Sequence, residues 1–148
     1  MNEILQNLKR TVGDITYFPA TKDAQIDFTN AMLKNNQFAQ MPDDYGLFLK
    51  HSNGMASGEI EFFGTEKIHR AEYSYNFPNI VDANEIFKNP PYPLMLNCVL
   101  LGYNLVNAII WDGNKKVYRI INRNFFTPVA EFANFVEVLK FIISRYEA

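Results

Sequence analysis

Residues 41–54, MPDDYGLFLKHSNG, begin and end as a short helix should. The proline suits the first helical position, and the two aspartates after it favour the positive end of the helix dipole. At the other end, Gly54 supplies a left-handed stop. Tyr45, Phe48 and Leu49 fall on one face. We therefore expect packing against a core, more than helix propensity, to hold this helix.

Two further helices are predicted before this segment. Apolar residues recur at helical spacing from Ile4 to Val12, and Gly13 ends the pattern. Thr21 can cap a second helix, which runs to about Phe38. Its apolar contacts are expected from Ile26, Phe28, Met32 and Leu33.

The pattern changes from helix to strand after Gly54. Four strands are predicted, near residues 59–63, 95–101, 107–111 and 116–122. The Asp112-Gly113 pair is typical of a hairpin turn and joins the last two strands. Residues 65–93 contain NPPYP and are predicted to form a long ordered loop, with a helical turn starting at Asp82.

A wide apolar stripe in FANFVEVLKFIISRY predicts a closing helix, which starts either at Thr127-Pro128 or nearer Phe132. The stripe consists of Phe132, Phe135, Val136, Leu139, Ile142, Ile143 and Tyr146. Helices, then strands, then a helix predict an α+β fold, in which a central antiparallel sheet is flanked by N-terminal helices and a C-terminal helix. The length predicts a single domain over residues 1–148.

Composition and charge limit the classes of function. Hydrophobic residues make up 48% of the chain and charged residues 20%, so burial can offset the entropy of ordering it. Neither a long apolar stretch nor a signal-peptide pattern is found, so a cytoplasmic protein outside the membrane is expected. Residues 41–100 carry eight acids and four bases, which argues against nucleic-acid binding and leaves open a basic macromolecular partner.

Signatures of catalysis and metal binding are not found in the sequence. The only histidines, His51 and His69, lie 18 positions apart, and the only cysteine, Cys98, suits a buried strand. No GxSxG or phosphate-binding glycine motif occurs. Glu59 and Glu61 could form a carboxylate pair, but outward-facing acids on a half-buried strand have the same spacing. We predict a protein that is not an enzyme, with no catalytic residue, cofactor or metal.

Aromatic residues make up 15% of the chain, which is more than one small core obviously needs. Tyr73, Tyr75 and Phe77 alternate in a polar segment, and Tyr92 lies among prolines. These side chains either anchor a partner as rigid contacts or pin their segment onto the sheet.

Motifs spread over most of the chain carry a family resemblance. They are Pro42, Tyr45, Phe48-Leu49 and Asn53-Gly54 in the first segment, followed by GEIEFFG, AIIWDGNKKVYRII and FANFVEVLKFI. With these motifs the chain resembles the SUKH superfamily, which contains bacterial immunity proteins and the yeast Smi/Knr-like cell-wall assembly regulators. The segment LGYNLVN departs from the family, in which many members have a more glycine-rich loop.

The resemblance implies an α+β fold with a central antiparallel sheet and a role in binding. The leading hypothesis is an immunity-type protein that binds a cognate bacterial toxin and neutralises it by occlusion. An acidic and aromatic surface is expected to make the contact, formed by Glu59, Glu61, Glu66, Tyr73, Tyr75 and Tyr92. Two alternatives stay open. One is an intracellular adaptor in a signalling or cell-envelope assembly complex, and the other is a small-molecule-binding protein or a hydrolase that uses Glu59 and Glu61.

Overall fold

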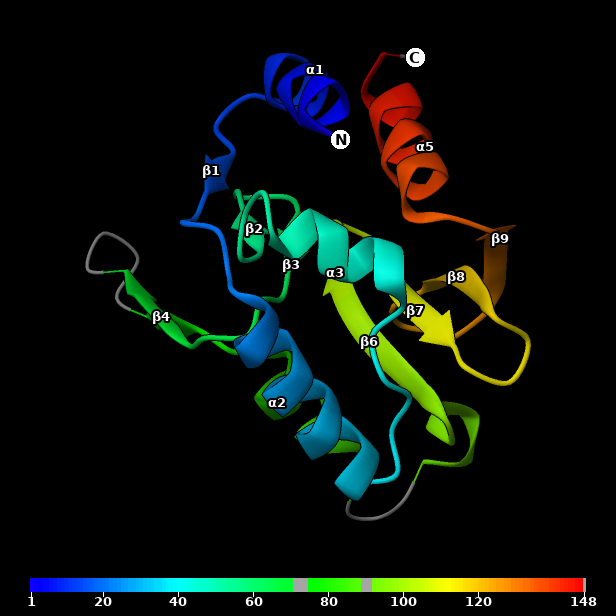
Figure 1. The fold of residues 1–148 in the computed structure, drawn as a ribbon. Helices are drawn as coiled ribbons and strands as arrows, with labels where there is room; N and C mark the ends of the chain where they lie inside the picture. Colours follow the sequence, from blue (N-terminus) through cyan, green and yellow to red (C-terminus); the bar gives the residue numbers. More distant parts are fainter. Residues whose placement is uncertain (71–74, 89–91, 148) are drawn as a thin grey trace.

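The computed structural model describes residues 1–70, 75–88 and 92–147 (Figure 1). In chain order the elements are α1 (Asn2–Val12), β1 (Thr16–Tyr17), α2 (Asp23–Asn35), α3 (Asp43–Leu49), β2 (Met55–Ala56), β3 (Glu61–Phe62), β4 (Ile68–Arg70), β5 (Tyr75–Phe77), α4 (Ile80–Asn84), β6 (Cys98–Tyr103), β7 (Asn107–Asp112), β8 (Val117–Asn122), β9 (Pro128–Phe132) and α5 (Phe135–Glu147). Short 3-10 turns occupy Glu85–Phe87 and Pro93–Met95.

The predicted α+β fold is confirmed. Seven of the described strands form one antiparallel sheet in the order β1-β2-β3-β6-β7-β8-β9, and β4 pairs with β5 in a separate hairpin. Helix α3 lies across the sheet, and α1 packs beside α5 (Figure 1). The predicted three-stranded meander forms as β6-β7-β8 within this sheet. Strand β6 starts at Cys98, later than expected, because Asn97 takes the left-handed backbone conformation after the turn at Pro93–Met95.

Strand β3 is shorter than predicted. The Ser57 hydroxyl accepts hydrogen bonds from the two backbone amides that precede β3, so the chain is still turning there. Beyond the end of β3, a side chain of α4 satisfies the edge of β6. The Asn84 amide donates to the Leu100 carbonyl at 3.0 Å and accepts from the Leu100 amide at 2.8 Å. This fully buried asparagine takes the place of a neighbouring strand.

The prediction of a long loop over residues 65–93 is wrong. Its described part contains the β4-β5 hairpin, α4 and a 3-10 turn. Helix α4 begins at Ile80 and not at Asp82, because the Asn79 side chain caps it and accepts from the Asp82 amide at 2.8 Å.

The predicted helix start at Thr127-Pro128 is also wrong. Pro128 is instead the first residue of β9, an edge strand, where the missing N–H of proline is tolerated. Helix α5 begins at Phe135. Its apolar stripe is buried largely as predicted, although Val138 is fully buried whereas Val136 is only partly buried.

Helix α2 contributes less to the core than predicted. Leu33 is buried, but Phe28 and Met32 are exposed, because this helix lies at the border of the sheet and buries only a narrow strip of its surface. Thr21 does not cap the helix. Its hydroxyl donates instead to the Gln25 side chain at 2.6 Å.

The β7-β8 hairpin forms as predicted, with a different residue in the left-handed conformation. Lys116 has φ 57°, whereas Gly113 is needed for close approach, since a Cβ there would lie 2.6 Å from the Asn97 carbonyl oxygen.

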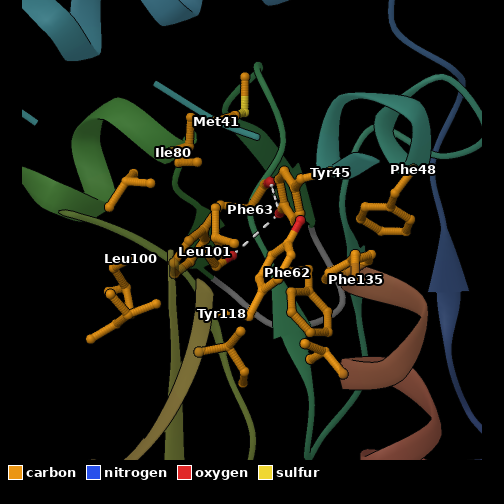
Figure 2. Close-up of a cluster of buried hydrophobic side chains, with 14 of the residues drawn as sticks. Met41, Tyr45, Phe48, Phe62, Phe63, Ile80, Leu100, Leu101, Tyr118 and Phe135 are labelled. Atoms are coloured by element: carbon orange, nitrogen blue, oxygen red, sulfur yellow. Dashed lines mark hydrogen bonds between the residues drawn. The ribbon is translucent and has the colours of Figure 1, made fainter. Parts of the chain in front are cut away.

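An aromatic cluster forms the centre of the core between α3, the sheet and α5 (Figure 2). It consists of Tyr45, Phe48, Phe62, Tyr118 and Phe135, whose neighbouring ring centroids lie 5.1 to 6.4 Å apart. The predicted buried face of α3 is therefore confirmed. Such edge-to-face and tilted pairs add specific geometry to the burial of large apolar surfaces.

The Tyr45 hydroxyl joins α3 to the residue that follows β3 and to strand β6. It donates to the Phe63 carbonyl oxygen at 2.5 Å and lies 3.3 Å from that of Leu101 (Figure 2). Leu101 lies at the β-bulge of β6, where the ladder to β7 shifts register. Burial, and secondarily the Glu61 carboxylate, raise the pKa of this hydroxyl well above its usual range, so it remains a donor.

The Asp44 carboxylate joins α3 to two other elements. One oxygen accepts from the Tyr118 hydroxyl of β8, and the other accepts from the Phe135 amide at 2.6 Å. Phe135 is the first residue of α5, so Asp44 satisfies one of the free amides at the start of that helix.

The turn HSNG after α3 redirects the chain into the sheet, as predicted. It also joins three segments. The Ser52 hydroxyl accepts from the Phe18 amide at 2.8 Å, and the Asn53 side chain accepts from the Thr65 amide at 2.8 Å. Gly54 has φ 93°, and a Cβ there would lie 2.7 Å from the Phe62 carbonyl oxygen.

We predict that Asp44→Ala lowers the free energy of unfolding by about 2 kcal/mol or more, because it leaves a buried tyrosine hydroxyl and a helix amide without their charged acceptor. Urea unfolding measures the change. Asp43→Ala is the matched control: Asp43 is exposed and occupies the same helical turn. Equal losses in the two variants would contradict a specific role for Asp44.

Candidate functional site

Two turns lie side by side at one end of the sheet. One joins β6 to β7 and the other joins β8 to β9. The Arg123 amide donates to the Val106 carbonyl at 2.8 Å, and its guanidinium donates to the Asn104 carbonyl at 3.3 Å. The second turn is therefore fixed directly to the first.

Exposed apolar side chains gather on these turns and on the neighbouring segment at residues 92–96. The exposed fractions are 63% for Leu105, 57% for Val106, 77% for Phe125, 38% for Phe126 and 62% for Leu94. Phe126 stacks on Tyr92 with ring centroids 5.4 Å apart. Tyr92, Leu94 and Phe126 also line a cavity of about 60 Å³ over the sheet. We call Tyr92, Leu94, Leu105, Val106, Arg123, Phe125 and Phe126 the sheet-end surface.

The sheet-end surface is held in shape by its own turn. The Asn122 side chain accepts from the amides of Asn124 and Phe125 at 2.9 and 3.0 Å, and the Phe126 amide donates to the Asn122 carbonyl at 2.9 Å. Phe126 has φ 58°, a conformation that bulky residues rarely adopt. Strain of this kind persists only where the surroundings enforce it, and it clusters at functional sites.

Arg123 brings a small group of polar side chains to the border of this surface. Its guanidinium lies 3.9 Å from the centre of the Tyr103 ring. Tyr103 pairs with Glu61 across β6 and β3. Burial raises the pKa of Glu61, and the positive charge of Arg123 opposes that rise. Burial likewise raises the pKa of Tyr103. A carboxylate whose pKa is shifted by burial and by a specific charged neighbour is a candidate for a functional site.

Two of the six predicted contact residues lie at or beside this surface, namely Tyr92 and Glu61. Tyr92 packs between Phe87 and Phe126, so it pins its segment and also borders the exposed patch.

The other four predicted residues lie elsewhere or are not described. Glu59 is exposed and accepts a hydrogen bond from Tyr146 of α5, and Glu66 accepts from Gln25 of α2 at 2.9 Å. Tyr75 lies in β5, where its backbone pairs with β4. Tyr73 lies outside the described residues.

A site that combines Glu59 with Glu61 lacks the pocket it would need. The cavity beside Glu61 measures about 10 Å³, barely room for one water molecule. Among the described residues, no group of three acidic, histidine or cysteine side chains could hold a metal ion. Cys98 is buried, and burial raises its pKa to about 11, which is unfavourable for a reactive thiolate. No helix in the described part of the chain has the length and hydrophobicity needed to span a bilayer.

Sequence reasoning missed the apolar residues of the two turns. The signal that could have found them is composition: LGYNLVN and NRNFFTP each place two adjacent apolar residues within an asparagine-rich turn. Turns of this kind are ordinarily polar, because their residues face water. An apolar pair in such a position therefore needs an explanation beyond chain reversal.

Glu61→Gln is predicted to stabilise the protein at about pH 7.5 and to have no effect below about pH 4. The folded-state pKa of Glu61 is raised, so its ionised form costs stability, and that cost disappears once the carboxyl is protonated in both states. Thermal unfolding at the two pH values tests this, with exposed Glu66→Gln as the control. A loss of stability at the higher pH would show that attraction to Arg123 outweighs burial.

No family model matches the chain, and no curated protein matches it. The comparisons therefore do not test the SUKH resemblance, which rests on sequence motifs alone.

Proposed function

We propose that this protein binds another protein through the sheet-end surface, and that it acts as an immunity-type protein that neutralises a cognate bacterial toxin by occlusion. The observation that carries the binding role is that two adjoining turns expose four large apolar side chains, Leu105, Val106, Phe125 and Phe126. Exposed apolar side chains that gather in this way are typical of interaction sites.

The residue types of the surface support a protein partner. Tyrosine and arginine are enriched among the residues that dominate binding energy, and Tyr92, Tyr103 and Arg123 supply them here. Around them, Phe125 and Val106 would exclude water on contact. The partner would therefore present a largely apolar patch, and the half-buried Glu61 offers one acidic contact at its border for a basic side chain.

The turns are preformed, which supports affinity. Hydrogen bonds from Asn122 and Arg123 fix the backbone, so little conformational entropy is lost when a partner binds. The toxin as partner follows from the SUKH resemblance. In that family the surfaces vary with their partners, and this surface includes LGYNLVN, the segment where the chain departs from the family.

An adaptor role in an envelope or signalling complex is the second candidate, because the same surface would serve it. Co-expression with neighbouring toxin-like genes separates the two roles. Rescue of growth supports immunity, and no rescue with any neighbour favours the adaptor.

We predict that Phe125→Ser and Val106→Ser abolish growth rescue while changing the free energy of unfolding by less than about 0.5 kcal/mol, because both side chains are largely exposed. Phe28→Ser is the control. Phe28 is 69% exposed but lies on α2, away from the two turns. Rescue that persists in both turn variants, or is lost in the Phe28 variant instead, would contradict the placement of the site.

A further inference from the structure

The opposite end of the sheet carries a second surface feature. A hollow of about 300 Å³ lies where β6 begins and the β7-β8 hairpin turns. Its lining includes Lys34, Phe38, Gln40, Asn97, Trp111 and Lys116. The whole length of strand β6, about 20 Å for six residues, separates the hollow from the β6-β7 turn that carries Leu105 and Val106.

The hollow combines an aromatic floor with a basic rim. Trp111, the only tryptophan of the chain, is half-buried and packs edge-on against Tyr118 at 4.9 Å, so its ring is held in place. Lys34 and Lys116 are exposed at the rim. Neither lysine makes an ion pair within the described part of the chain.

The one acid beside the hollow in sequence, Asp112, does not neutralise these lysines. Its carboxylate accepts from the amides of Asn114 and Lys115 at 2.9 and 3.1 Å, and it lies 3.6 Å from Arg119. The positive charge at the rim is therefore available to a ligand.

Lys116 occupies a backbone position that suits glycine better. Its φ of 57° closes the hairpin, where glycine or asparagine would be less strained. The side chain of Lys116 is exposed at the rim of the hollow, where it can contact a ligand. Asn97, with φ 55°, lines the same hollow.

We propose that this hollow binds an acidic segment of a protein, with carboxylates paired to Lys34 and Lys116 and an apolar side chain on Trp111. The rim is open and its polar side chains are exposed, so a free small molecule would be only partly enclosed, whereas small-ligand sites usually bury most of the ligand. A peptide segment needs less enclosure, because it can contact both lysines and the tryptophan at the same time. The hollow shares no lining residue with the sheet-end surface.

Trp111 gives a direct readout of binding. The probe is an end-blocked pentapeptide of four glutamates around one phenylalanine, titrated at low salt while tryptophan emission is followed. We expect a saturable change that weakens as salt is added. Lys34→Gln and Lys116→Gln should each weaken binding about 3-fold, and the double variant about 10-fold. Lys115→Gln is the matched control, because Lys115 lies in the same hairpin but does not line the hollow.

Lys116→Gly separates binding from folding. The substitution should leave the melting temperature unchanged or raise it, because glycine adopts the left-handed conformation without strain. It should still weaken binding of the peptide, because the lysine charge is lost. The Phe125→Ser variant should bind the peptide as tightly as the unchanged protein does. A failure of the proposed function can therefore be distinguished from a failure of this inference. Three outcomes would overturn the inference: equal binding of the glutamine version of the peptide, equal weakening by Lys115→Gln, or tighter binding of inorganic phosphate or a mononucleotide than of the peptide.

Discussion

Adjacent residues of α3, Asp44 and Tyr45, make the polar contacts on which the rest of the fold depends. Tyr45 fixes the helix to carbonyls at β3 and β6, and Asp44 fixes it to β8 and to the start of α5. An apolar core alone would let a short helix slide or rotate at small cost. Buried polar groups do not, because a shifted register would leave each of them without a partner.

This fixed core explains why the candidate sites lie on turns. The aromatic cluster and the central meander occupy the interior, so the side chains that are free to contact a partner lie at the two ends of the strands. At one end the turns carry apolar side chains, and at the other end the hairpin carries lysines around a tryptophan. Each end also holds a bulky or charged residue in the left-handed conformation, Phe126 or Lys116, which the rigid sheet beneath can sustain.

Local pattern was sufficient for elements that bury apolar side chains in the core. The apolar run of β7, the partial alternation of β8 and the helical spacing of Tyr45 and Phe48 are of this kind. Prediction from local pattern failed for Phe28, because the residue type does not reveal whether another element covers that face of the helix.

Long-range polar pairs could not have been predicted from the sequence either. Asp44 meets Tyr118 and Phe135 across 74 and 91 positions, and no local pattern encodes such pairs. The candidate site was predicted only in part. Glu61 and Tyr92 were selected by charge and aromaticity, whereas the apolar residues of the two turns were not selected, because turns are ordinarily polar.

The edges of the seven-stranded sheet restrict how any partner can attach. Strand β9 starts with a proline and presents Glu131, and β1 at the other edge has only two residues. Neither offers the long row of free backbone groups that β-augmentation or amyloid-like stacking requires. A partner that approaches either edge of this sheet would therefore have to recognise side chains, and its specificity could change by point substitution without any change in the backbone ladder.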